Sequence, residues 1–211
     1  MEVLGYSKLQ ADSPPEAMVK EVERSLRSEQ NQVDGHLVYG GGDHDACESL
    51  LKFGIQESDL YRMIEEVIGE PAFFVHQGPI IIHSSDHPTD LGIGAAHPSR
   101  HGISVFRALS SNPEDISATL KLYPTSHHLS STEFARLGGA MKSFDLRSKE
   151  ILFVRGAVKM EISLPAGGSL VWKGFSEDPW GSDLPSSSEA FAFMRIYSKP
   201  TPWRAGSASA G

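Results

Sequence analysis

The sequence predicts an α+β fold that is mainly β, with helices in the first third and strands in the rest. Before residue 70, apolar residues recur every three or four positions, which is the period of a helix buried on one face. From Ala72 onward, short apolar segments alternate with polar residues and are separated by Gly, Pro and Ser, as strands are. About eight such strands close most naturally as a jelly roll, whose inner face can hold a metal and a small ligand.

Three helices are predicted in the first part of the chain. Pro14-Pro15 begin the first, because proline is tolerated in the first helical turn. Asp43 or Asp45 can cap a short second helix that runs through Phe53, and Ser58 caps a third that Gly69 ends. We expect residues 1–13 to be irregular, and residues 30–42 to form a loop with one short strand at Leu37-Val38-Tyr39.

The strands are predicted from their alternation and from the turn residues between them. The clearest case is the face formed by Val158, Met160, Ile162 and Leu164, with polar residues between them. The predicted strands are Ala72–His76, Pro79–Ser84, Ile103–Leu109, Ile116–Tyr123, Ile151–Val154, Ala157–Leu164, Ser169–Lys173 and Glu189–Tyr197.

One domain is expected over residues 1–198, with a helical segment at 14–70. A further short helix interrupts the strands, with Ser131 as its N-cap and Glu133, Phe134 and Leu137 within it. Residues 199–211 are rich in Pro, Gly, Ser and Ala, so we predict a disordered tail.

Composition excludes several classes of function. The net charge of −8 argues against a nucleic-acid partner, since binding phosphates requires clustered Lys and Arg. The single cysteine, Cys47, fits a reducing compartment. No secretory signal or apolar segment of membrane-spanning length is present, so a cytoplasmic protein without a membrane partner is expected. A homodimer or heterodimer is compatible with these features.

The stretch His76–His87 is the main candidate for a functional site. His83 and Asp86 follow an apolar strand, and imidazole plus carboxylate with open coordination positions suits Fe(II). Four more potential donors lie nearby in the sequence: His87, Asp90, His97 and His101. The alternative is a solvated, histidine-rich loop without a metal.

His127 and His128 are a second candidate. Adjacent histidines on a turn cannot both face one point unless the backbone bends sharply. One of them is therefore expected to bond to backbone while the other is exposed, with a ligand role for either left open.

Two segments resemble enzymes of the phytanoyl-CoA dioxygenase type. The first runs from Ile103-Ser-Val-Phe-Arg-Ala-Leu through Glu114-Asp115 to Tyr123-Pro-Thr-Ser-His127, similar to a family strand that ends in Pro-Gly-Ser-His. The second, Leu164-Pro-Ala-Gly-Gly-Ser-Leu-Val-Trp172, resembles the family's Pro-x-Gly-Asp-hydrophobic strand. The resemblance covers roughly residues 70–198. It implies a double-stranded β-helix that uses Fe(II) and 2-oxoglutarate to activate oxygen, with N-terminal helices packed on it.

The resemblance also implies positions for the site residues. The family's His-x-Asp pair corresponds best to His83 and Asp86, which are one residue further apart, while His76-Gln-Gly resembles the variant of halogenating relatives. The distal histidine should follow Trp172, but no histidine follows His128, so Asp178 or Glu177 is the substitute. Arg195 would bind the carboxylate of 2-oxoglutarate.

Two functions follow from this pattern. The first is an Fe(II)/2-oxoglutarate-dependent oxygenase that acts on a small organic molecule. The second is a metal-free jelly roll that has lost the iron triad and acts as a ligand-binding protein, an isomerase or cyclase, or a non-catalytic partner subunit. The substrate is not specified beyond an aromatic lining from Phe73, Phe106, Trp172 and Phe193.

Overall fold

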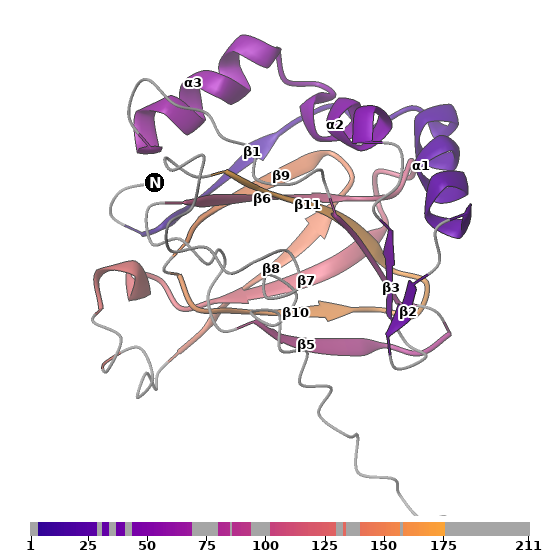
Figure 1. The fold of residues 1–211 in the computed structure, drawn as a ribbon. Coiled ribbons are helices and arrows are strands. Elements are labelled where there is room, and N and C mark those ends of the chain that lie inside the picture. Colours follow the sequence, from indigo (N-terminus) through magenta and orange to yellow (C-terminus); the bar gives the residue numbers. More distant parts are fainter. Residues whose placement is uncertain are drawn as a thin grey trace, which may run out of the picture.

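Two antiparallel sheets face each other in the computed structural model, and three helices cover the outer side of the larger one (Figure 1). The fold is therefore mostly β and jelly-roll-like, as the sequence predicted. The structure describes residues 4–28, 31–33, 37–40, 44–68, 80–84, 86–93, 102–129, 133, 140–156 and 158–175.

The larger sheet has seven strands in the order β1-β9-β6-β11-β4-β3-β2. The smaller sheet has four, in the order β5-β10-β7-β8. The strands are β1 (Tyr6–Gln10), β2 (Asn31–Val33), β3 (Leu37–Gly40), β4 (Ile80–Ser84), β5 (Thr89–Ile93), β6 (Ile103–Ala108), β7 (Ile116–Leu122), β8 (Lys142–Arg147), β9 (Glu150–Arg155), β10 (Met160–Leu164) and β11 (Ser169–Phe175).

From β4 to β11, the chain crosses between the two sheets at every step except the β7–β8 hairpin. These crossings give the pair of sheets two distinct ends. At the turn end, β4, β6, β8 and β10 end and β5, β7, β9 and β11 begin. At the loop end, β5, β7 and β9 end and β6, β8 and β10 begin.

The core between the two sheets is apolar. The predicted face of β10 is confirmed, because Val158, Met160, Ile162 and Leu164 are all buried there. The seven-stranded sheet contributes side chains such as Ile82 to this core. Alternate residues of a strand face opposite ways, so this core defines the inner face of each sheet.

The helices pack on the opposite, outer face of the seven-stranded sheet (Figure 1). They are α1 (Glu16–Ser28), α2 (His44–Lys52) and α3 (Glu57–Ile68). Their stripes of buried residues, which include Val22, Leu50 and Ile64, share one cluster with Ile81 and Phe153 of the sheet. The spacing of these apolar residues forms the stripe that a helix buries.

Arg107 of β6 is fully buried beneath this layer. Its guanidinium donates hydrogen bonds to the carbonyls of Phe53, Asp12 and Ser148, the last at 3.2 Å. Burial lowers the pKa of Arg107 to about 10, while Asp12 acts in the opposite direction, so the side chain remains charged at neutral pH. Arg107 thus joins three separate segments to the sheet.

Lys173 of β11 is the second buried cation on the outer face. It forms an ion pair with Glu48 of α2, which also lies 3.4 Å from Lys52. Burial lowers the pKa of Lys173 to about 8, and Cys47 acts in the opposite direction.

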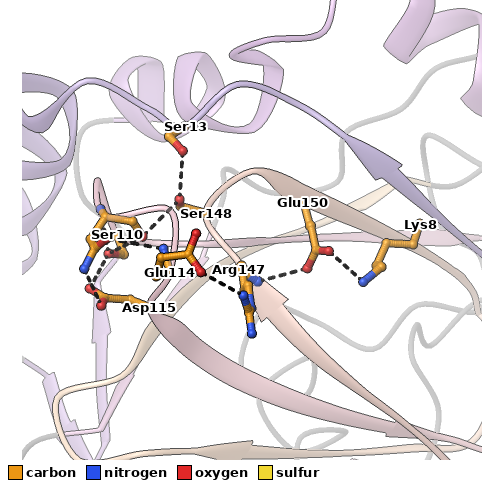
Figure 2. Close-up of polar contacts among 9 residues, drawn as sticks. Lys8, Ser13, Ser110, Glu114, Asp115, Arg147, Ser148 and Glu150 are labelled. Atoms are coloured by element: carbon orange, nitrogen blue, oxygen red, sulfur yellow. Dashed lines mark hydrogen bonds and ion pairs between the residues drawn. The ribbon is translucent and has the colours of Figure 1, made fainter.

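A network of polar side chains lies at the turn end and links neighbouring strands and turns there (Figure 2). Ser148 donates to Ser13 at 3.2 Å, and Arg147 donates to Glu114 at 3.2 Å. Glu150 accepts from Lys8 at 2.7 Å and from the Arg147 N–H at 3.2 Å. Burial raises the pKa of Glu150, but these hydrogen bonds outweigh it, so the pKa lies below its ordinary value.

Several predicted elements need correction. Residues 1–13 are not irregular throughout, since Tyr6–Gln10 form β1, and β2, β5 and β8 were not predicted. The three predicted N-terminal helices are present, although α3 begins at Glu57, one residue before Ser58. Of the predicted helix at Ser131, only Glu133 is described, and it is helical. Two predicted strands, Ala72–His76 and Glu189–Tyr197, and the tail at 199–211 lie outside the described residues. Among the described helices, none has the length and apolar character to cross a membrane.

Candidate functional site

His83 lies on β4 at the turn end, opposite Ser169 of β11. Its Nδ1 is 2.6 Å from the Ser169 hydroxyl oxygen, which is hydrogen-bond distance. Ile81 and Val171, two positions away on the same strands, are buried under the helices. By strand alternation, His83 therefore belongs to the outer face of the sheet.

Asp86 follows β4 in the connection to β5 and is exposed. This connection is held by hydroxyl groups: Ser84 donates to the His87 carbonyl and lies 3.1 Å from the Thr89 hydroxyl. The described residues contain no group of three His, Cys, Asp or Glu side chains able to hold a metal ion. His83 and Asp86 are thus near each other in the chain but do not complete a metal site with a third described donor.

Of the other predicted donors, His87 and Asp90 are described and exposed. The rest lie outside the described residues, as does Arg195, the predicted 2-oxoglutarate residue: His76, His97, His101, Glu177 and Asp178. The strands next to them show where their segments begin. β5, which precedes residues 94–101 in the sequence, ends at the loop end. β11 ends there too, because Phe175 pairs with Ile103. His83 and Asp86 are at the other end.

His127 and His128 lie at the loop end in a 3₁₀ turn, Ser126–His128. The backbone bends sharply at Thr125, whose φ of 66° is left-handed. The rings of His127 and His128 lie side by side, with centroids 3.8 Å apart and planes at 42°. His128 is exposed, as expected for one of the two rings. The His127 ring packs so closely on Gly5 that a β-carbon at position 5 would collide with it.

Phe106 and Trp172 are brought together on the inner face, as the predicted aromatic lining required. Their rings stack with centroids 6.2 Å apart, and the Trp172 indole N–H donates to Ser104 at 2.8 Å. The other two predicted lining residues, Phe73 and Phe193, lie outside the described residues. The inner face thus offers an aromatic surface with one internal hydrogen bond.

Lys142 and Tyr6 form a polar contact that the sequence did not reveal. The Lys142 ammonium donates to the Tyr6 hydroxyl at 2.9 Å, at the loop end. Tyr6 was placed in an irregular segment, and the two residues are far apart in the chain, so no local pattern could have indicated the pair. It adds a cation to the end from which segments 94–101 and 176 onward continue.

Neither a family model nor the sequence of a curated protein matches this chain. Solved structures do match its fold, and three enzymes are among them. The non-heme α-ketoglutarate-dependent epimerase SnoN from nogalamycin biosynthesis has a TM-score of 0.57 at 12% identity, covering 87% of this chain and 86% of its own. The carbocyclase SnoK from the same biosynthesis has a TM-score of 0.54 at 12% identity, covering 82% and 79%.

HygX from Streptomyces hygroscopicus, solved with nickel and 2-oxoglutarate bound, has a TM-score of 0.57 at 11% identity, covering 83% and 84%. This chain has the fold of these enzymes. The likeness shows this fold alone and does not reach the narrower phytanoyl-CoA dioxygenase family. An identity of 11–12% does not assign a role to any single residue, so each site residue depends on the geometry of this chain.

Proposed function

We propose that this protein is a non-heme Fe(II)/2-oxoglutarate-dependent oxygenase of the double-stranded β-helix type that acts on a small organic molecule. The observation that carries the proposal is the strand order. β4-β11-β6-β9 in one sheet faces β5-β10-β7-β8 in the other, in a fold shared with three enzymes, two named as α-ketoglutarate-dependent and one solved with 2-oxoglutarate. The narrower phytanoyl-CoA dioxygenase-like assignment rests on the sequence motifs at Ile103–His127 and Leu164–Trp172.

Two sets of iron donors are to be compared. The first is the predicted set of His83, Asp86 and Asp178, with Arg195 for 2-oxoglutarate. In its favour, His83 Nδ1 contacts the Ser169 hydroxyl. A hydrogen bond from the ring nitrogen that does not bind the metal commonly orients a metal-binding imidazole. Against it, His83 belongs to the outer face and lies at the turn end, whereas Asp178 follows a strand that ends at the loop end.

The second set takes its histidines from His97 and His101, which lie in the sequence between β5 and β6. β5 and β11, the strands that precede these histidines and Asp178 in the sequence, both end at the loop end. Either set would supply imidazole and carboxylate donors, which suit Fe(II). Bound iron with 2-oxoglutarate would supply the oxygen activation. The aromatic surface of Phe106 and Trp172 would contribute to an apolar environment for the substrate.

Metal analysis of the full chain purified without oxygen, followed by an assay for conversion of 2-oxoglutarate to succinate, tests the proposal. We expect one Fe(II) per chain and succinate formation that requires both iron and oxygen. If no iron binds even with added Fe(II), the protein is instead the metal-free jelly roll: a ligand-binding protein, an isomerase or cyclase, or a partner subunit.

The variants His83→Ala and His97→Ala then separate the two donor sets. Loss of iron in His83→Ala with iron retained in His97→Ala assigns the turn-end set. The opposite result assigns the loop-end set. His36→Ala, outside both sets, is the control for a histidine removed elsewhere.

A further inference from the structure

Lys142 lies over two aromatic rings at the loop end. Its ammonium is 5.4 Å from the centroid of the Tyr6 ring and 5.1 Å from that of Phe144, within the range of a cation–π contact. The two rings meet edge to face, with centroids 4.9 Å apart and planes at 62°. These contacts fix the position of the ammonium beside the Tyr6 hydroxyl.

The group belongs to the inner side of the molecule. Lys142 pairs with Leu122, which is buried between the sheets, and Tyr6 is buried in the same core. By alternation along β8, Lys142 shares the face of Phe144 and Leu146, which pack in that core. Lys142 is itself exposed, so the pair lies where the apolar core meets solvent at the loop end.

Lys142 differs from most of the other lysines that have described partners in the kind of group it contacts. Four of these lysines form ion pairs with glutamates: Lys8, Lys20, Lys52 and Lys173. Within the described part of the chain, the contacts of Lys142 are a phenol and two rings, with no carboxylate at ion-pair distance. In a protein of net charge −8, an ammonium without a carboxylate at the edge of an apolar core favours an anionic ligand.

The donors of the pair suit a carboxylate in particular. An ammonium has three N–H donors, and one of them is directed to the Tyr6 oxygen. Because the Tyr6 oxygen accepts that bond, its own proton remains available to donate to a ligand. A carboxylate has two oxygens, so one can accept from Lys142 and the other from Tyr6.

We propose that Lys142 and Tyr6 bind the carboxylate of a small-molecule substrate whose apolar body lies against Phe144 and the core. The proposal rests on the proposed function, because it names the substrate class of that enzyme. It is distinct from co-substrate binding, which Arg195 was predicted to perform.

The test is a binding measurement on the full chain in the presence of a chelator and without 2-oxoglutarate, so that it does not depend on iron. The probe is benzoate, and benzamide is its uncharged counterpart of the same shape. Ligand-observed NMR or calorimetry in the millimolar range gives the affinity. We expect benzoate to bind and benzamide to bind at least about tenfold more weakly, because the charge-assisted bonds are lost.

Lys142→Met should weaken benzoate binding about tenfold or more, and Tyr6→Phe several-fold, whereas Lys142→Arg should retain most of it. The matched control is Lys121→Met. Lys121 lies between the buried Leu120 and Leu122 on β7, so it faces outward, and its removal changes the net charge by the same amount. Far-UV circular dichroism and the melting temperature confirm that each variant is folded.

Three results would overturn the proposal: equal binding of benzamide, benzoate affinity unchanged in Lys142→Met, or equal losses in Lys142→Met and Lys121→Met. Direct binding of 2-oxoglutarate that is tighter than that of benzoate in wild type and is lost in Lys142→Met would also overturn it, because the pair would then serve the co-substrate. Failure of iron binding leaves this measurement unaffected, so the two proposals can fail separately.

Discussion

The two faces of the seven-stranded sheet are held by different interactions. The inner face is filled by apolar side chains such as Phe106 and Leu170, and among the described residues its buried charge is Glu150, at the turn end. The outer face buries two cations, Arg107 and Lys173, among equally apolar neighbours. The difference indicates that the two sheets associate through apolar burial. The layer of helices is held on the larger sheet both by apolar burial and by contacts of the two buried cations.

Removing Arg107 should have the largest effect. Arg107→Met leaves three backbone carbonyls without their donor, and we expect it to lower the free energy of unfolding by about 3 kcal/mol or more. Urea unfolding followed by circular dichroism measures the change. Arg62, which forms exposed contacts with Asp59 and Glu66, is the control, and Arg62→Met should change stability by about 0.5 kcal/mol or less. Equal losses in both variants would contradict a special role for the buried guanidinium.

The Lys173–Glu48 pair should respond unequally to removal of its two members. Glu48→Gln leaves a buried ammonium without its carboxylate and should cost about 2–3 kcal/mol at pH 7. Lys173→Met should cost less, because Glu48 is half-buried and keeps Lys52 at 3.4 Å. Urea unfolding at pH 7 compares them, and a larger loss in Lys173→Met would contradict the argument.

The pH dependence of Glu48→Gln provides a second measurement. Burial already places the folded-state pKa of Lys173 at about 8, below its unfolded value, and loss of Glu48 lowers it further. The unfolded state therefore binds more protons between these pKa values, so the stability of the variant should rise as pH increases through that window. A flat profile from pH 7 to 10 would show that Lys173 is not desolvated.

Glu150 should give the smallest of the three effects. Glu150→Gln removes charge-assisted bonds from Lys8 and the Arg147 N–H, and we expect a loss of about 1–2 kcal/mol at pH 7. The folded-state pKa of Glu150 lies below its unfolded value. The extra free energy of unfolding of wild type over Glu150→Gln is therefore fully present above about pH 4.3, and it is lost as pH falls through the folded-state pKa. Glu114→Gln is the exposed control, with an expected change within about 0.5 kcal/mol. A pH-independent difference between wild type and Glu150→Gln would exclude the ionic contribution.

Prediction from sequence succeeded for strands whose side chains alternate between buried and exposed positions. Met160, Ile162 and Leu164 on β10, between two neighbouring strands, showed this clearly. Strands at the edge of a sheet did not, because one side of the strand meets solvent and polar residues are tolerated. Three of the six residues of β8 are exposed, and β1 reads Tyr-Ser-Lys-Leu-Gln, so neither strand produced an apolar pattern.

The contacts of buried polar residues and of the candidate site were less predictable than the fold, because they join distant parts of the chain. Arg107 appears in the sequence as one polar residue in an apolar strand, and its partners are carbonyls of other segments, which no side-chain pattern encodes. The histidine count drew attention to His83, but the face on which a residue lies depends on strand register, which Ser169 and Val171 reveal only once β4 and β11 are paired.

The pairing of β1 with β9 also constrains the order in which the protein is completed during synthesis. Tyr6 pairs with Val154, so the first strand leaves the ribosome long before its partner exists. At typical elongation rates of about 5–20 residues per second, this interval is roughly 7–30 s. During that time Tyr6 has neither its strand partner nor Lys142 beside it. A nascent chain arrested before β9 should therefore leave its N-terminal segment accessible to protease, and that segment becomes protected only after β9 has been made.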